Sequence, residues 1–273
     1  HRLCLGNKSI NQLRLWLLGL HIPDTVVLGF SIYDKFKREE KFDFGDIYNS
    51  VIAPRVGSSV AVRCSSNLED SDEQSFAGYF DTYLDVPNQV NEIEEKIISS
   101  YKKFYAGNNL IGTPQYNIQL SIMVQQMILP KFSGFLFTLD PINPSSNWRK
   151  VEYWQGPRGD REGYSITLNR ETGKRVSSGR DSNQYPLPID IQQKLHHAAT
   201  ELEHHFSIPQ DVEFLISGSD DDLYLVQSRP ITAFSYSPDK VRVDELQKFY
   251  EILEDNRKRY HHHPVLSATN ISE

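Results

Sequence analysis

The chain has 273 residues, a formal net charge of −7 and a hydrophobic content of 38%. This length is enough for one large domain or two modest ones, and 14 Tyr and 14 Phe argue against a disordered chain. The negative charge disfavours a nucleic-acid partner. Two cysteines are too few for a disulfide framework, so a cytoplasmic location is expected, and no segment reaches the roughly 18–20 apolar residues of a membrane span.

The first part of the chain is expected to contain two helices and two strands. Residues 9–20 read as a helix that ends at Gly19, and residues 25–33, "TVVLGFSIY", read as a strand. The charged segment 34–46 is expected to be irregular, and "SSVAVRCSS" (58–66) reads as a second strand before a polar loop. Apolar residues at a spacing of three and four predict a helix over 88–105.

The second part of the chain is expected to be rich in antiparallel strands. Strands are predicted within 117–128, 133–141 and 149–156, and a hairpin within 163–179 turns at "ETGK". A helix over 188–206 leads into a further hairpin, and a tail helix is expected over 239–260. This order indicates an α+β protein rather than a regular βαβ repeat.

The hairpin "PQDVEFLISGSDDDLYLVQSRPIT" (209–232) carries polar groups in two otherwise apolar strands. Residues two apart share one face of a strand. If the turn is "GSDDD", Glu213 lies opposite Gln227 and Asp211 opposite Arg229, with cross-strand neighbours about 5 Å apart. Burying such groups unpaired costs several kcal/mol. Two interpretations remain: an Asp211–Arg229 pair with Glu213 in water, or a site in which carboxylates hold Mg²⁺ and Gln and Arg contact ATP phosphates.

This hairpin resembles the end of the ATP-grasp nucleotide-binding domain of the phosphoenolpyruvate synthase and pyruvate phosphate dikinase family, which shows D-I-E-W and L-Q-x-R-P-x-T strands. Three upstream segments resemble further motifs of the family in the same order: "LGNKSINQLRLWLLGLHIPDTVVLGFSI", "VAVRCSSNLEDSDEQSFAGYFDTYLDV" and "VQQMILPKFSGFLFTLDPINP". The resemblance covers most of residues 5–235. It implies an α+β ATP-grasp fold, in which two lobes with mixed or antiparallel sheets clasp a nucleotide.

The resemblance also implies a domain organisation. We expect an N-terminal lobe over 1–110, shortened between 31 and 59, and a C-terminal lobe over 111–235. Residues 236–273 are expected to form a linker helix that leads out to a further domain.

Lys8, Arg63 and Gly78 match family residues of the first lobe. By resemblance, Lys8 and Arg63 contact the phosphates and act in catalysis, Arg63 stabilising charge on the transferred phosphoryl group with a guanidinium that can bind two oxygens. Gly78 belongs to a loop that folds over the phosphates. A lysine at the surface, or an Arg63 paired with a nearby carboxylate, remains the structural alternative.

The remaining site residues follow from the later motifs. The adenine is expected to meet backbone groups around Gln126, Met127 and Ile128, at the hinge between the lobes. By resemblance, Glu213 binds Mg²⁺ and Asp211 has a supporting or second-metal role, while Gln227 and Arg229 contact the phosphates.

The sequence departs from the family pattern in two places. The opening loop has Asn7 and Ser9 where the family has glycines, and it lacks the first glycine of a P-loop. The family's G-L-G-E turn appears only as "GPRGD", residues 156–160. No catalytic role is carried onto this turn.

The resemblance implies a dikinase-type phosphotransferase that binds ATP and Mg²⁺ and releases AMP. The phosphoryl group is expected to pass to a histidine on a phosphohistidine domain, and then to a substrate-binding domain, neither of which is in this sequence. Relatives act on pyruvate, glucans or rifampicin. The alternative is a degenerate nucleotide-binding module with a regulatory role.

Two histidine clusters are expected to lie outside this function. His197, Glu201 and His205 share one helix face, where a metal site competes with a solvated surface. His261–His263 lack the sequence context of a phosphohistidine.

Overall fold

A computed structural model describes residues 5–67, 81–111, 118–158, 163–178, 186–206 and 208–231, and the chain divides into two units. Unit 1 contains the described residues up to Leu13 together with Pro23–Met127. Unit 2 contains Arg14–Ile22 and the described residues from Ile128 onward. The predicted lobe boundary after residue 110 therefore lies within unit 1, because the strand that follows it pairs into the sheet of that unit. The predicted tail helix and Gly78 lie outside the described residues.

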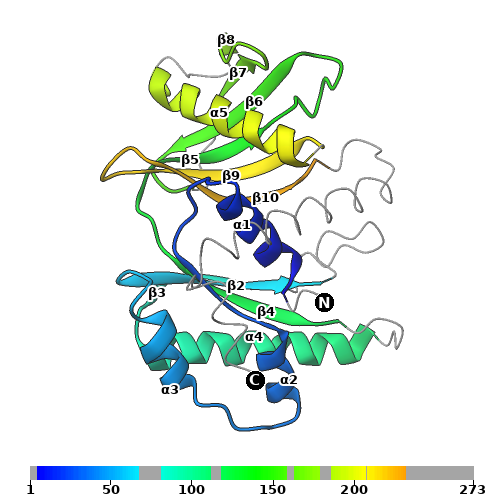
Figure 1. Ribbon diagram of the computed structural model, residues 1–273, viewed down its shortest axis with the longest axis vertical. Coiled ribbons are helices and arrows are strands. Elements are labelled where there is room, and N and C mark those ends of the chain that lie inside the picture. Colours follow the sequence, from blue (N-terminus) through cyan, green and yellow to red (C-terminus); the bar gives the residue numbers. More distant parts are fainter. Residues whose placement is uncertain are drawn as a thin grey trace. The chain divides into compact units, whose positions relative to one another are not determined.

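Unit 1 is built on a four-stranded antiparallel sheet with the order β1-β4-β2-β3 (Figure 1). Its strands are β1 (Thr25–Leu28), β2 (Ser59–Ser66), β3 (Thr82–Pro87) and β4 (Leu120–Gln126). Helix α4 (Val90–Ile111) runs along one face of this sheet. The sequence predicted β2, α4 and β4, although α4 extends beyond the predicted end; β3 was not predicted.

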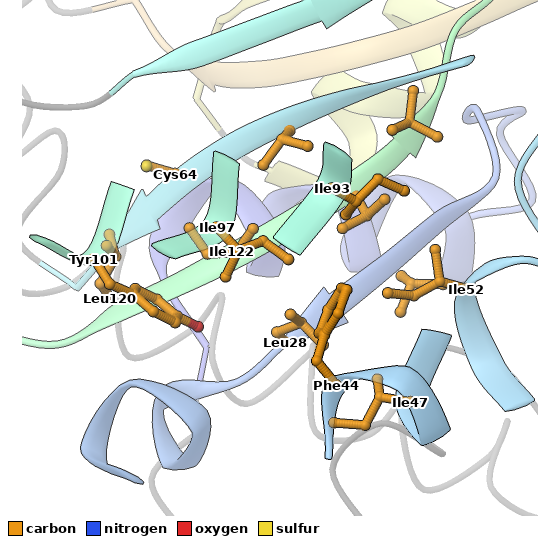
Figure 2. Close-up of a cluster of buried hydrophobic side chains, with 14 of the residues drawn as sticks. Leu28, Phe44, Ile47, Ile52, Cys64, Ile93, Ile97, Tyr101, Leu120 and Ile122 are labelled. Carbon is orange, nitrogen blue, oxygen red and sulfur yellow. The ribbon is translucent and has the colours of Figure 1, made fainter. Parts of the chain in front are cut away.

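One hydrophobic core lies between this sheet and α4, as Figure 2 shows. Alternate residues of β2 face it, so Val62 and Cys64 are buried together. From α4 come Ile93, Ile97 and Tyr101, at a helical spacing of four, and each is at most 1% exposed. The predicted apolar stripe of this helix is therefore confirmed.

The segment between β1 and β2 corrects two predictions. The strand expected over 25–33 ends at Leu28, and α2 (Phe30–Lys37) follows it. Tyr33 is fully buried, with its ring 5.3 Å from that of Tyr101, so tertiary packing overrides the local strand pattern.

The charged stretch expected to be irregular also contains regular structure. Helix α3 (Phe44–Ile47) begins after Asp43, whose carboxylate accepts a hydrogen bond from the Asp46 N–H at 2.9 Å. This is a side-chain N-cap. A short π-helix, η1 (Tyr48–Ile52), continues directly from α3.

Unit 2 is built on a six-stranded antiparallel sheet with the order β10-β9-β5-β6-β7-β8, and α5 (Ile189–Phe206) packs on one face of it (Figure 1). The strands are β5 (Pro130–Phe137), β6 (Trp148–Gln155), β7 (Tyr164–Asn169), β8 (Arg175–Ser178), β9 (Gln210–Ser217) and β10 (Leu223–Pro230). Helix α5 and strands β6 to β10 fall where the sequence predicts them. Strand β5 was expected over 133–141, but it begins at Pro130 and ends at Phe137. Both sheets are antiparallel throughout, so the predicted α+β class is confirmed.

Helix α1 (Asn7–Leu17) ends as the sequence predicts. Gly19 adopts a positive φ of 74°, and its N–H donates to the Trp16 carbonyl at 2.9 Å. The Leu20 N–H donates to the Leu15 carbonyl at 3.1 Å, which completes a Schellman motif. A glycine accepts this backbone conformation without steric cost.

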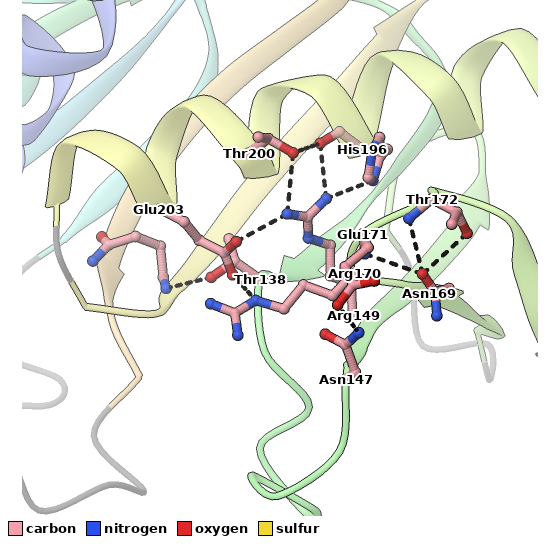
Figure 3. A network of polar contacts seen from close by, with 11 residues as sticks. Thr138, Asn147, Arg149, Asn169, Arg170, Glu171, Thr172, His196, Thr200 and Glu203 are labelled. Atoms are coloured by element: carbon pink, nitrogen blue, oxygen red, sulfur yellow. Dashed lines mark hydrogen bonds and ion pairs between the residues drawn. The ribbon is translucent and has the colours of Figure 1, made fainter.

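A buried polar network joins α5 to β6 and β7 (Figure 3). The Arg149 side chain is 1% exposed and forms an ion pair with Glu203 at 2.9 Å. Its Nη1 also donates to the ring Nδ1 of His196 at 2.6 Å, and its Nη2 donates to the Thr200 hydroxyl at 3.1 Å. Arg170 reaches the other oxygen of Glu203 at 3.0 Å.

Candidate functional site

The strand register of the β9–β10 hairpin is the one that the sequence predicts. Gln227 pairs with Glu213 and Arg229 with Asp211, beyond an irregularity between Leu225 and Gln227. Residues that pair across antiparallel strands project from the same face. The hairpin therefore brings all four polar side chains to one face of the sheet.

The opposite face of the same strands is apolar. Val212, Phe214 and Ile216 alternate with the polar positions and are at most 1% exposed in the core beneath α5. The four polar groups therefore occupy the face that α5 leaves open, which is called the open face below. Alternation places them there without burying a charge in the core.

Asp211 and Arg229 form an ion pair on the open face. The Arg229 Nη2 lies 2.8 Å and its Nε 2.9 Å from the Asp211 Oδ2. The Asp211 side chain is 12% exposed and that of Arg229 49% exposed. The other carboxylate oxygen, Oδ1 of Asp211, is buried without a hydrogen-bond partner among the residues that the structure describes. An unsatisfied buried carboxylate oxygen is costly, and it is a ready acceptor for a cation or a hydrogen-bond donor.

Glu213 and Gln227 form the next row of the open face. Both are partly exposed, and Phe135 of β5 is the partner of Glu213 on its other side. Glu213 is thus flanked by an amide and an aromatic ring across the sheet. Its distance along β9 from Asp211 is two residues, roughly 7 Å, which separates the two carboxylates without isolating them.

Three residues that the sequence interpretation did not single out hold the start of β9. Gln210 is fully buried; its N–H donates to the Thr138 hydroxyl at 2.9 Å, and its side-chain oxygen accepts from the Ser228 hydroxyl at 2.9 Å. These bonds fix the backbone next to Asp211. Their signal in the sequence is weak, because Gln, Thr and Ser are equally common on solvated strands.

In unit 1, buried hydroxyls hold the beginning of α1 against β2 and β4. The Gly6 N–H donates to the Ser121 hydroxyl at 3.0 Å, and the Ser9 N–H donates to the Ser65 hydroxyl at 3.1 Å. The Ser121 hydroxyl in turn donates to the Ser65 carbonyl at 3.0 Å. A Cβ on Gly6 would lie 2.2 Å from that carbonyl oxygen, so only glycine fits. The sequence interpretation named none of these contacts.

This attachment puts the backbone of Lys8 over the face of the unit 1 sheet from which Arg63 projects. Arg63 and Ser65 are two residues apart in β2 and therefore project together, away from the α4 core. Lys8 lies in the first turn of α1, between residues bonded to Ser65 and Ser121. Two cationic residues near one face of the sheet are compatible with a polyanionic ligand.

The expected hinge lies where the chain passes from unit 1 to unit 2. The Gln126 N–H donates to the Asp24 carbonyl at 2.8 Å, and the Met127 N–H donates to the Ser59 carbonyl at 3.1 Å. Those two donors are therefore engaged within unit 1. The adenine contact expected around Gln126, Met127 and Ile128 stays a prediction.

The acidic and histidine side chains limit what metal site is feasible. Among the described residues, no group of three or more His, Cys, Asp or Glu is arranged to hold a metal ion. On α5, His205 and Glu201 approach to only 3.9 Å. Asp211 and Glu213 supply hard oxygen donors, which fit a Mg²⁺ ion that takes its other ligands from phosphates and water. None of the described helices is long and apolar enough to span a bilayer.

Curated relatives include phosphotransferases. The chain is 29% identical over 268 residues to rifampicin phosphotransferase of Bacillus subtilis, an alignment of 86% of this chain and 28% of that protein. It is 27% identical over 209 residues to a probable phosphoenolpyruvate synthase of Archaeoglobus fulgidus, covering 63% of this chain and 27% of the relative. The chain thus spans little more than a quarter of the length of these relatives.

Solved structures and a family model were also compared. The D-alanine-D-alanine ligase of Coxiella burnetii matches with a TM-score of 0.44 and 10% identity, over 94% of this chain and 59% of the ligase. The family model described as "Pyruvate phosphate dikinase, AMP/ATP-binding domain" matches residues 7–190 and 162–248. The family match spans both units and every candidate site residue that the sequence analysis named. The chain belongs to the pyruvate phosphate dikinase AMP/ATP-binding domain family.

Proposed function

We propose that this chain binds ATP with Mg²⁺ and is the nucleotide-binding part of a dikinase-type phosphotransferase. The observation that carries the proposal is the open face of the β9–β10 hairpin, where Asp211, Glu213, Gln227 and Arg229 stand together. Family membership supports the nucleotide, and the relatives named as phosphotransferases support the reaction class.

Each side chain has a role that its chemistry suits. Glu213 and the Oδ1 atom of Asp211 would hold Mg²⁺, which supplies charge neutralisation at the phosphates when bound. Arg229 is half exposed and held by Asp211, so its guanidinium is accessible to phosphate oxygens. The side-chain amide of Gln227, beside Glu213, would donate a hydrogen bond to a phosphate oxygen.

Unit 1 has phosphate-binding candidates of its own. Lys8 and Arg63 would contact phosphates, with Arg63 acting on the transferred phosphoryl group and the backbone near Ile128 meeting the adenine. Positioning and charge neutralisation are the main contributions a protein makes to phosphoryl transfer. The phosphoryl group would then pass to a histidine on another domain of the parent protein, with AMP as the nucleotide product.

Calorimetric titration of the chain with Mg²⁺ and a non-hydrolysable ATP analogue tests the proposal. Glu213→Gln and Arg229→Gln should each weaken binding about tenfold or more, since each removes a charged contact to the metal or phosphates. The matched controls are Glu201→Gln on α5 and Arg170→Gln, which should bind like the unmodified chain. Equal affinities for the site variants and the controls would show that the nucleotide does not bind at the hairpin.

One observation favours a nucleotide-binding module that does not transfer phosphate. The Ser9 N–H donates to the Ser65 hydroxyl, so this amide at the start of α1 is engaged within the protein. AMP release by the parent protein separates the two functions. A parent protein that binds ATP but forms no AMP, and whose ATP affinity is unchanged by Lys8→Ala, would be a binding module.

A further inference from the structure

Arg158 lies over two aromatic rings on the open face of the unit 2 sheet. Its guanidinium carbon is 4.9 Å from the centre of the Phe135 ring and 5.3 Å from that of Trp154. The two rings meet edge to face with their centres 6.1 Å apart. Among the described residues, Arg158 has no carboxylate partner. A guanidinium stacked on aromatic rings keeps its N–H edges directed outward, where they can bind an anion.

The platform under Arg158 is fixed by its neighbours. The Gly156 N–H donates to the Lys131 carbonyl, and the Gly156 carbonyl accepts from the Ser133 hydroxyl, both at 2.8 Å. Gly156 has a φ of 75°, so the chain turns sharply just before Arg158. A Cβ on Gly163 would lie 2.7 Å from the Trp154 ring, which shows that this backbone packs directly against the indole.

The position of Phe135 relates Arg158 to the proposed metal ligand. Phe135 pairs with Glu213 on one side and with Glu152 on the other, so these three residues form one row across the open face. A guanidinium over the ring of Phe135 therefore stands beside the Glu213 position. An Mg²⁺ ion keeps its oxygen ligands about 2 Å away. Phosphates that bind the same Mg²⁺ ion as Glu213 would therefore lie close to the guanidinium of Arg158.

We propose that Arg158 is an anion-binding residue of this site and contacts the metal-bound phosphates of the nucleotide. The inference rests on the proposed function. It adds a third cationic side chain to the site, from the "GPRGD" segment, to which the sequence analysis assigned no role. In this segment the chain departs from the G-L-G-E pattern, so the contact would distinguish it from relatives that keep that pattern.

The test is calorimetric titration of the chain in the presence of Mg²⁺ with a non-hydrolysable ATP analogue and, separately, with AMP. Arg158→Gln should weaken binding of the ATP analogue about tenfold, the usual scale for one charge-assisted hydrogen bond, and leave AMP binding nearly unchanged. The affinity of Arg158→Lys for the ATP analogue should lie between those of the unmodified chain and Arg158→Gln, since lysine keeps the charge but loses the planar stack. The matched control is Lys96→Gln, which removes a cation 5.8 Å from the ring centre of Tyr83 in unit 1 and should change neither affinity.

A second variant tests the aromatic platform. Trp154→Leu should weaken binding of the ATP analogue because it releases the guanidinium, and it should cause no further loss when combined with Arg158→Gln. An additive loss in the double variant would mean that the ring acts without Arg158 and would overturn the platform.

The outcomes separate this inference from the proposed function. Unchanged affinity of Arg158→Gln for the ATP analogue, with a correctly folded chain by circular dichroism, would overturn the role of Arg158 alone. An equal loss for AMP would also overturn it, because the contact would then lie away from the metal-bound phosphates. Failure of the unmodified chain to bind the analogue would overturn both.

Discussion

Two arginine–carboxylate pairs lie on opposite faces of the same sheet. Arg149 and Glu203 approach to 2.9 Å on the face covered by α5, and Arg229 and Asp211 approach to 2.8 Å on the open face. The distances are nearly equal, but the surroundings differ. The Arg149 side chain is 1% exposed, and that of Arg229 is 49% exposed.

The difference lies in what each pair leaves unused. Arg149 also donates to His196 and Thr200, and Glu203 also accepts from Arg170, so both members of the covered pair have further partners within the protein. The Nε of Arg149 is buried without a hydrogen-bond partner among the described residues, but it lies in the core, where a ligand has no access. Burial lowers the pKa of Arg149, while the charge of Glu203 opposes that shift. The open pair leaves a buried carboxylate oxygen of Asp211 unsatisfied and the guanidinium half exposed. An unsatisfied carboxylate oxygen beside a half-exposed guanidinium, and not the ion-pair distance, makes the open pair the candidate ligand site.

The largest expected loss of stability comes from breaking the covered pair. Arg149→Met should lower the free energy of unfolding by about 3 kcal/mol, because Glu203, His196 and Thr200 each lose a hydrogen-bond partner in a buried environment. Urea denaturation measures it. Arg170→Met is the control, since Arg170 binds the same carboxylate from a 39% exposed position and should cost at most about 1 kcal/mol. A smaller loss for Arg149→Met than for Arg170→Met would contradict this account.

The next effect disturbs the packing between the two faces. A Cβ on Gly134 in β5 would lie 2.2 Å from the Glu152 carbonyl oxygen and 2.7 Å from the Phe214 ring. Gly134→Ala should therefore lower the free energy of unfolding by about 2 kcal/mol, because the strands and the ring have to move apart. Thermal denaturation checks this. Gly19→Ala is a useful contrast: its Cβ meets nothing within 4 Å, so only the strain of a positive φ remains.

A smaller stability effect is expected on the open face. Arg229→Gln should lower the free energy of unfolding by about 1 kcal/mol, because water screens the half-exposed guanidinium and the glutamine amide still offers a donor to Asp211, whose side chain is only 12% exposed. Its effect on binding of the ATP analogue should exceed its effect on folding. A stability loss as large as that of Arg149→Met would show that the open pair is structural, which was the alternative left by the sequence.

The smallest effect is a dependence of stability on pH. Burial, together with the positive charge of Arg149 and a minor contribution from His197, lowers the pKa of His196 from its ordinary 6.5, while Glu203 opposes the shift. In the folded protein His196 accepts a hydrogen bond from Arg149 in its neutral form, whereas the unfolded chain binds a proton below pH 6.5. Stability is therefore complete above that value and declines as pH falls through the folded pKa.

The free energy of unfolding, measured between about pH 5 and 7, tests this direction. His196→Gln removes the titration and keeps an acceptor for Arg149, so its stability should vary less over this range. Identical pH slopes for the two proteins would exclude His196 as the cause.

The hairpin part of the site was predictable because strand periodicity is a strong local rule. Alternation places Asp211 and Glu213 on one face, and the length of the turn fixes which residues of β10 lie opposite them. The helices α4 and α5 follow from their apolar spacing in the same way. The prediction for residues 25–46 was wrong in part, because the burial of Tyr33 against α4 is a tertiary effect that the local sequence pattern does not contain.

The candidate residues of unit 1 were named only by resemblance, and their roles stay predictions. Lys8 and Arg63 are far apart in sequence, and the groups that bring them to one face are hydroxyls of Ser65 and Ser121 more than 50 residues from their partners in α1. Neither propensity nor periodicity encodes such contacts. The same holds for Arg158, whose position depends on two rings from different strands.

The turn between β9 and β10 has a consequence for changes in chain length. Lys131 contacts the Asp221 carboxylate at 2.7 Å, and Lys194 donates to the Asp221 carbonyl at 2.7 Å, so the turn is anchored from two sides. Substitutions of turn residues other than Asp221, which supplies the carboxylate and has a φ of 57°, should be tolerated, whereas one inserted or deleted residue would shift β10 by one position and exchange its apolar and polar faces. The number of residues in this turn is therefore under stronger constraint than their identity.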